Sequence, residues 1–120
     1  MKHLKRFNEA KDLNTIKDIC LELEDIGMLI RFDQNWLYSK HKGSYLDFID
    51  FLVPISLHKN KDIEWEDVKD CILRLKDYLG DRFVTFTYRL FSSDYIREVG
   101  LNDHIIIDGP LQEIIIEYRG

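Results

Sequence analysis

The sequence contains little proline, glycine and cysteine, and no long run of apolar residues interrupts its polar pattern. Two prolines and six glycines among 120 residues, with 45% apolar residues, do not fit a disordered or low-complexity chain. The apolar runs are too short for a transmembrane helix, and the start lacks the apolar stretch of a secretory signal peptide. Two cysteines fit a reducing compartment, so we expect a cytoplasmic protein without a membrane partner.

Basic residues are outnumbered by acidic ones, 17 to 22, and they are unevenly distributed. The net charge of −5 argues against a general binder of nucleic-acid phosphates and against binding to an anionic membrane surface. The first eleven residues nevertheless carry Lys2, Lys5, Arg6 and Lys11 against Glu9, a net charge of +3, which leaves −8 for the rest. We therefore predict a basic N-terminal arm at residues 1–12 and a single domain at residues 13–120.

Motifs that would indicate chemistry are missing from the sequence. The glycines form neither GxGxxG nor GxxxxGK, and no GxSxG elbow occurs. Cys20 and Cys71 are far apart and each belongs to an apolar helical stripe, which predicts buried free thiols rather than a zinc site. Asp47 and Asp50 lie three residues apart on a strand, so they point to opposite faces and form no carboxylate pair unless a bulge realigns them. The sequence thus predicts no enzyme activity, no catalytic residues, no cofactor and no metal.

Two amphipathic helices are predicted from the spacing of apolar residues, at about residues 14–26 and 63–79. The candidate N-caps are Asn14 and Asp62, and the candidate stop residues are Gly27 and Gly80. Each helix has one apolar stripe. Both therefore need a surface to pack on.

The segments between and after the helices alternate as strands do. Strands are expected at residues 28–39, 44–57, 83–90 and 112–118, with a short one at 105–107. The sequence KHKGS at residues 40–44 is typical of a hairpin turn, and residues 92–99 suggest one helical turn. A break of the first strand at residues 33–35 is the other reading, since those residues favour turns.

The element order α-β-β-α-β-β predicts an α+β two-layer sandwich. We expect a four-stranded antiparallel sheet with two helices on one face, a circularly permuted ferredoxin-like topology. Pro54 fits poorly, because this topology makes its strand central and proline cannot donate to a sheet ladder. A bulge at Pro54 or a different strand order would resolve the conflict.

Helices on one face leave the other face of the sheet open. Its predicted residues include the apolar side chains Phe48, Leu52, Phe83 and Ile115, and a cluster of that kind is typical of an interaction site. Three interpretations of this face stay open. Leu52 or Phe83 packs under the arm or under the loop at residues 92–110, the face forms a homodimer, or its aromatic residues stack single-stranded nucleic acid. A small-molecule pocket beside the long hairpin is a further hypothesis.

The start MKHLKRFNEA resembles the MKxxKxFxE start of small uncharacterised proteins of tailed bacteriophages, and IKDICLELEDIGMLIRF is similar in style to them. This resemblance implies a phage origin and a host-cytoplasm setting. It implies no activity and no catalytic residues.

The leading hypothesis is a non-enzymatic protein–protein interaction module, a phage accessory or host-modulating protein that acts as a homodimer. The alternative is single-stranded nucleic-acid binding on the open face, which the acidic composition disfavours. The candidate interaction surface consists of Phe48, Leu52, Phe83 and Ile115 on the sheet and Leu4, Lys5 and Phe7 on the arm.

Overall fold

The computed structural model describes residues 2–35, 46–54 and 62–119. Its elements in chain order are α1 (Lys2–Asp25), β1 (Leu29–Asn35), β2 (Leu46–Leu52), α3 (Trp65–Leu79), the short 3-10 helix η1 (Gly80–Arg82), β3 (Phe83–Leu90), β4 (Arg97–Val99) and β5 (Leu111–Arg119). The predicted hairpin turn at residues 40–44 and the apolar positions 55–57 lie outside the described residues.

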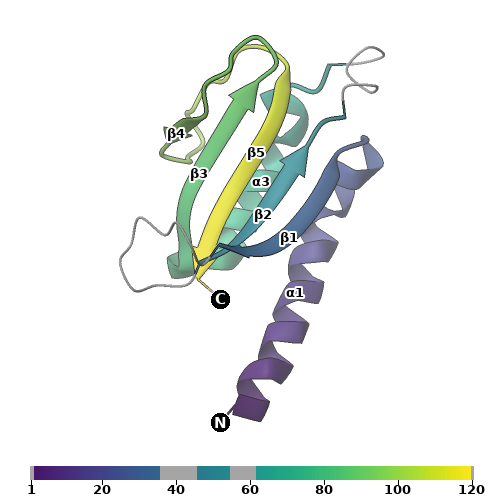
Figure 1. Ribbon diagram of the computed structural model, residues 1–120, viewed down its shortest axis with the longest axis vertical. Coiled ribbons are helices and arrows are strands. Elements are labelled where there is room, and N and C mark those ends of the chain that lie inside the picture. The colour runs from purple at the N-terminus through teal and green to yellow at the C-terminus, as the bar shows by residue number, and fades with distance from the viewer. Residues whose placement is uncertain (1, 36–45, 55–61, 120) are drawn as a thin grey trace.

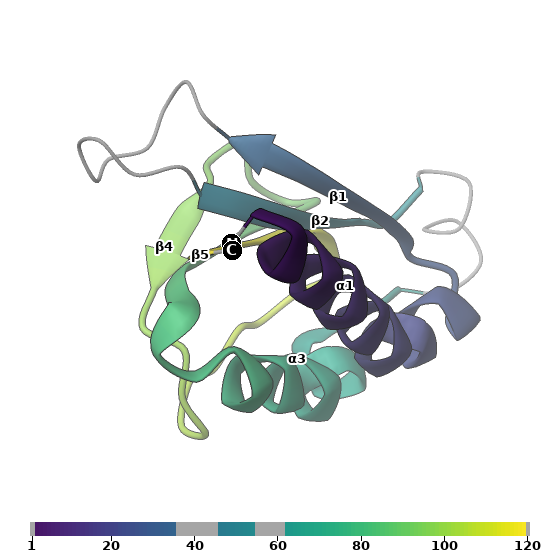
Figure 2. The ribbon, with the colours of Figure 1, turned by 90° about the horizontal axis from the view of Figure 1, so that it is seen from below.

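The strands form one antiparallel sheet in the order β1-β2-β5-β3-β4 (Figure 1). Helices α1 and α3 lie on the same side of it (Figure 2). The α+β class is therefore confirmed. The four-strand count is wrong, because the sheet has five strands. The additional strand β4 lies within residues 92–99, where we expected a helical turn, and it pairs with the edge of β3.

Helix α1 is about twice as long as predicted. It begins at Lys2 and runs without a break through residues 12 and 13, because no glycine or proline interrupts residues 2–25. It ends as expected before Gly27, which has a φ of 103°. The N-terminal part of α1 extends past the end of the sheet (Figure 1).

Helix α3 begins two residues later than predicted, and Glu64 rather than Asp62 caps it. The Glu64 backbone N–H donates to the Asp67 carboxylate over 2.9 Å, the reciprocal part of a capping box. The helix ends at Gly80, as predicted, with a φ of 54°.

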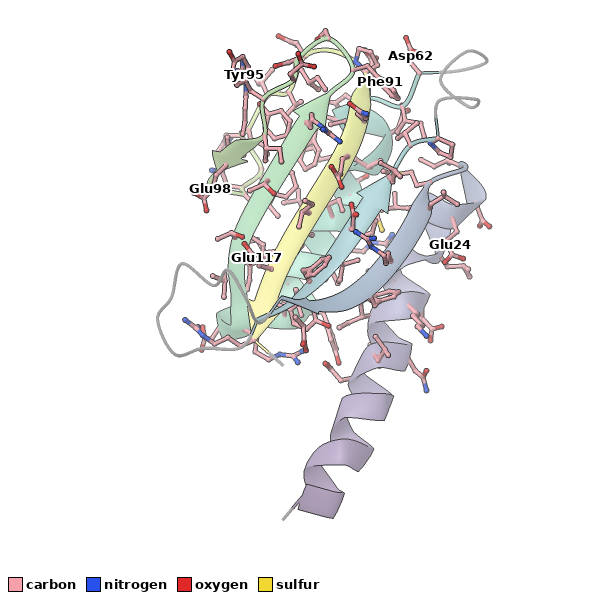
Figure 3. The ribbon with its side chains drawn as sticks, in the orientation of Figure 1. Glu24, Asp62, Phe91, Tyr95, Glu98 and Glu117 are labelled. Atoms are coloured by element: carbon pink, nitrogen blue, oxygen red, sulfur yellow. The ribbon has the colours of Figure 1, made fainter. Side chains whose placement is uncertain are left out.

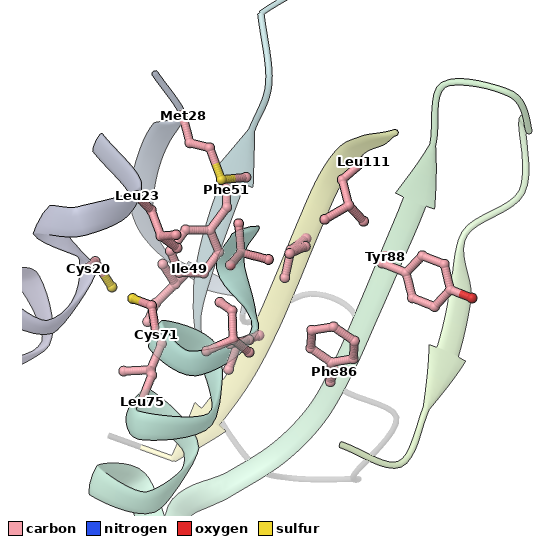
Figure 4. Close-up of a cluster of buried hydrophobic side chains, with 14 of the residues drawn as sticks. Cys20, Leu23, Met28, Ile49, Phe51, Cys71, Leu75, Phe86, Tyr88 and Leu111 are labelled. Carbon is pink, nitrogen blue, oxygen red and sulfur yellow. The ribbon is translucent and has the colours of Figure 1, made fainter. Parts of the chain in front are cut away.

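The core lies between the helices and one face of the sheet (Figure 4). Its largest fully buried side chains are Ile16, Leu23, Ile49, Phe51, Trp65, Ile72, Leu75, Phe86, Leu111, Ile114 and Ile116. Leu101 and Ile107 belong to the same buried cluster, so the connection between β4 and β5 packs on the helix side. One interpretation was that the loop at residues 92–110 covers the open face. The part of that loop between β4 and β5 packs on the opposite side of the sheet and does not cover it.

Pro54 no longer conflicts with a central strand. β2 lies between β1 and β5 but ends at Leu52, two residues before the proline. The Val53 backbone N–H still donates to the Gln112 carbonyl over 2.9 Å. The ladder therefore stops just before the residue that cannot donate, and no bulge is needed at Pro54.

An irregularity at the start of β3 changes the side on which Phe83 lies. Phe83 pairs with Tyr118 and Thr85 pairs with Glu117, so Val84 is the extra residue on its strand. Phe83 consequently packs against the core, with the Lys76 ammonium of α3 5.9 Å from its ring centre. The placement of Phe83 on the open face was wrong, because strict alternation holds only where no residue is inserted.

Candidate functional site

The open face is the face of the sheet opposite α1 and α3, and it is turned toward the viewer in Figure 3, where Glu117 is labelled on it. Cross-strand neighbours arrange its side chains in three rows. From β1 toward β3 these rows are Leu29–Leu52–Glu113–Arg89, Arg31–Asp50–Ile115–Thr87, and, starting at β2, Phe48–Glu117–Thr85. Apolar, charged and hydroxyl side chains therefore share this face.

Phe48, Leu52 and Ile115 share the open face, as predicted, and all three are partly buried. On the β2–β5 side each faces a charged residue, while Leu52 also faces Leu29 of β1. The Arg31 guanidinium lies 6.0 Å from the centre of the Phe48 ring, which places a cation over an aromatic face. The surface is thus mixed in character. The predicted arm residues Leu4, Lys5 and Phe7 fall within the first turns of α1.

The centre of the open face holds four charged residues from four adjacent strands, which we call the charged cluster: Arg31, Asp50, Glu113 and Arg89. Arg31 donates to Asp50 Oδ2 over 2.9 Å from one side. Arg89 donates to Glu113 Oε1 over 3.1 Å from the other. Asp50 faces Ile115 and Leu52 faces Glu113 in the register of β2 and β5, so the two carboxyl groups are diagonal neighbours between the two arginines.

The two carboxyl groups of the cluster are far more buried than a solvated sheet face requires. Asp50 is 6% exposed, and the Glu113 side chain is 15% exposed. Burial of the Glu113 carboxyl raises its pKa to about 7, and a hydrogen bond to Asp50 and the charge of Asp50 act in the same direction, against lowering by Arg89 and Arg31. Glu113 therefore exchanges its proton near neutral pH.

A hollow of about 380 Å³ opens at the charged cluster. It is lined by Leu29, Ile30, Arg31, Asp50, Leu52, Arg89 and Glu113. Two buried polar atoms on its lining, Asp50 Oδ1 and Arg89 Nε, have no hydrogen-bond partner within the described part of the chain. Leu29 at its edge is 58% exposed. The hollow thus combines apolar walls with an unpaired acceptor and an unpaired donor.

Sequence reasoning missed the pairing of Asp50 with Glu113. Asp47 and Asp50 do lie on opposite faces, as predicted, because they pair with Tyr118 and Ile115 respectively. The partner of Asp50 instead comes from β5, and only the register of two distant strands reveals it. The sequence signal for charge on this face of the last strand was the spacing of Glu113 and Glu117, which are four residues apart and so share a strand face.

Cys20 and Cys71 are free and buried, as predicted. Figure 4 shows their side chains pointing toward one another from α1 and α3. Burial raises the pKa of the Cys20 thiol to about 12 and that of Cys71 to about 11. The Cys71 thiol donates to the Ile19 carbonyl over 3.0 Å. Both groups therefore stay protonated and act as packing residues.

Comparison of the chain with protein-family models, with curated protein sequences and with solved structures finds no match. Among residues 2–35, 46–54 and 62–119, no group of three or more histidine, cysteine or acidic side chains is arranged to hold a metal ion. Within the same residues, no helix has both the length and the apolar character needed to cross a membrane. The fold and the site define an α+β domain with a mixed, partly buried open sheet face.

Proposed function

We propose that the chain is a non-enzymatic protein-binding module that acts as a homodimer through its open face and the first turns of α1. The observation that carries this proposal is the one-sided packing of the domain. α1, α3 and the connection between β4 and β5 all pack on one face of the sheet (Figure 2). The opposite face holds Phe48, Leu52 and Ile115, which a second surface would bury.

The composition of the open face suits a second copy of itself. A homodimer interface is isologous, so the same patch must complement itself after a two-fold rotation. The charged cluster contains two arginines and two carboxyl groups that are already paired within the face. Two such faces can therefore meet without a net repulsion, and apolar residues between the ion pairs supply buried area.

The first turns of α1 support the same proposal by charge and by position. Residues 1–11 carry +3 while the rest of the chain carries −8, so the basic arm of one copy is complementary to the acidic body of another. The helix there extends past the sheet (Figure 1). A helical segment of this length is marginal alone in water, and contact with a second copy would stabilise it.

A sedimentation dilution series tests the homodimer. We expect a dimer that dissociates on dilution. Leu52→Asp should shift the midpoint of the monomer–dimer transition to a protein concentration at least about tenfold higher, because burying one charge in the interface costs more than about 1.4 kcal/mol. Leu21→Asp is the matched control, because Leu21 is 53% exposed on α1, away from the open face. A wild-type chain that is monomeric at every concentration contradicts the proposal, as does an equal effect of both substitutions.

The arm has its own test. Lys5→Glu should weaken the dimer, and the loss should shrink at high salt, because screening removes the attraction between arm and body. A salt-independent effect would mean that the arm does not act by charge complementarity.

Two further parts of this proposal concern origin and topology. The order of the long strands places β5 beside β3, the two neighbours that a circular permutation of the ferredoxin-like fold would join, and this supports the permuted topology. The phage setting follows only from the resemblance of the N-terminal sequence.

The alternative function, single-stranded nucleic-acid binding, is favoured by the Arg31 guanidinium over Phe48. Its test is an oligonucleotide titration in which affinity falls steeply with salt.

A further inference from the structure

We propose that the charged cluster binds a primary alkylammonium group, carried by a lysine side chain or by a small aliphatic amine. The site is the hollow lined by Arg31, Asp50, Glu113 and Arg89 together with Leu29, Ile30 and Leu52. This inference does not rest on the homodimer, but the hollow lies on the same open face, so an amine and a second copy of the chain compete for it.

The arrangement of the cluster leaves one buried carboxylate oxygen without a hydrogen-bond donor. The two arginines bind one oxygen each, Asp50 Oδ2 and Glu113 Oε1. The other oxygen of Asp50, Oδ1, is buried, and it has no donor among the described residues when Glu113 is ionised. Two ionised carboxyl groups in contact repel one another, so a proton or another donor must lie between them.

An ammonium group can replace that proton without changing the net charge of the cluster. With both carboxyl groups ionised, the two arginines make the cluster neutral, and with Glu113 protonated it carries +1. A bound ammonium on the ionised pair also gives +1, a state that the site already accommodates near neutral pH. An ammonium is compact and has three N–H donors, so it can reach Asp50 and Glu113 together.

The walls of the hollow suit the alkyl chain behind the ammonium. The side chains of Leu29 and Leu52 form its apolar lining, and Leu29 is 58% exposed at the edge. Long amines bury their methylene stems along apolar surface while the charged end meets polar partners. The volume of about 380 Å³ lies within the range of small-molecule pockets, roughly 300–1,000 Å³.

Binding should be linked to pH because the ligand and the proton compete. Glu113 is faced by Asp50 from β2, by Arg89 from β3 and by Arg31 from β1, and Glu117 follows it on the same face of β5. Below pH 7 the ammonium must displace the proton of Glu113, so affinity should fall by up to about tenfold per pH unit. Above pH 7 the carboxyl is already ionised, and affinity should be nearly constant.

A carbon-13 NMR titration of the Glu113 carboxyl in the full chain tests the proposal. We expect n-butylammonium chloride to lower the apparent pKa of Glu113 progressively, because it stabilises the ionised pair. Tetramethylammonium chloride at the same concentration is the matched probe, since it has the same charge and no N–H donor. Equal responses to the two salts, or no response to n-butylammonium, would overturn the proposal.

Two peptides identify the source of the ammonium group. Acetyl-Gly-Lys-Gly-amide should lower the pKa of Glu113, and the same peptide with norleucine in place of lysine should not. Binding of the lysine peptide and of n-butylammonium supports the proposed site for both sources. A response to the norleucine peptide equal to that of the lysine peptide contradicts it.

Variants separate this site from the homodimer. In the variants the amine titration is followed by the carbon-13 signal of the Asp50 carboxyl. Glu113→Gln should reduce n-butylammonium affinity by at least about tenfold and remove its pH dependence, while Glu117→Gln on the same strand should keep both. Each titration is repeated at two protein concentrations. Loss of amine binding with an intact dimer, or the reverse, shows which of the two proposals has failed.

Discussion

Arg82 donates two parallel hydrogen bonds, each 2.8 Å long, to the carboxylate of Asp12, which lies 70 residues earlier in the chain. The Tyr78 hydroxyl donates a further hydrogen bond to Asp12. Hydrogen bonding from Arg82 lowers the pKa of Asp12 despite its partial burial. These contacts connect α1 with the end of α3 and with η1.

Asp12→Asn should lower the free energy of unfolding by about 1–3 kcal/mol, because it removes a partly buried, charge-assisted, bidentate pair. Urea unfolding at pH 7 measures the loss, with the exposed Asp18 of α1 as the control position for the same substitution. The pKa of Asp12 is depressed in the folded state, so its contribution is present above its ordinary value of 3.8 and is lost as pH falls through the lower folded value. Equal losses at both positions would contradict the structural role of the pair.

Glu113 should give the stability curve a slope of the opposite sign. Its folded pKa of about 7 lies above its ordinary value of 4.5, so the folded chain binds more protons there between these values. The free energy of unfolding should therefore fall as pH rises from about 4.5 to 7. Glu113→Gln should remove this part of the slope. The free energy of unfolding of the variant, relative to that of the wild type, should therefore be higher at pH 8 than at pH 5.

Glu117→Gln is the matched control for that measurement, because Glu117 lies on the same face of β5 and accepts a 2.8 Å hydrogen bond from Thr85. It should leave the slope between pH 4.5 and 7 in place. An unchanged slope in Glu113→Gln would show that another group titrates in this window.

Phe83 and Phe48 should respond differently to truncation, although the sequence assigned both to one face. Phe83→Ala should lower the free energy of unfolding by about 1–3 kcal/mol, since the ring packs against the core. Phe48→Ala should cost less and should instead weaken the proposed dimer. Chemical unfolding and sedimentation on both variants make the comparison. A larger effect of Phe83→Ala on dimerisation than on stability would contradict the observed placement of its ring.

The two thiols should be unreactive in the folded protein. Cys20 and Cys71 are buried, and burial raises the pKa of each to about 12 and 11 respectively, so almost no thiolate forms at pH 8. We expect a thiol-specific disulfide reagent to label them only at the rate of unfolding. Labelling should become fast in urea. Rapid labelling of native protein at pH 8 would mean that α1 separates from α3 without global unfolding.

The sequence by itself determined the elements whose signal is local. The apolar stripes of α1 and α3, the stop at Gly80, and the inward positions Ile49 and Phe51 follow from periodicity, because side chains three or four residues apart share a helix face and alternate residues share a strand face. The burial of Cys20 and Cys71 follows from the same stripes.

The tertiary structure decided what depends on registers between distant segments. The extra residue Val84 turns Phe83 toward the core, and the short strand β4 forms only because β3 offers an edge. Asp50 and Glu113 meet because β2 and β5 pair with one particular register across more than half of the chain. A one-residue slip would move every side chain of a strand to the other face, so the charged cluster is a property of the assembled sheet.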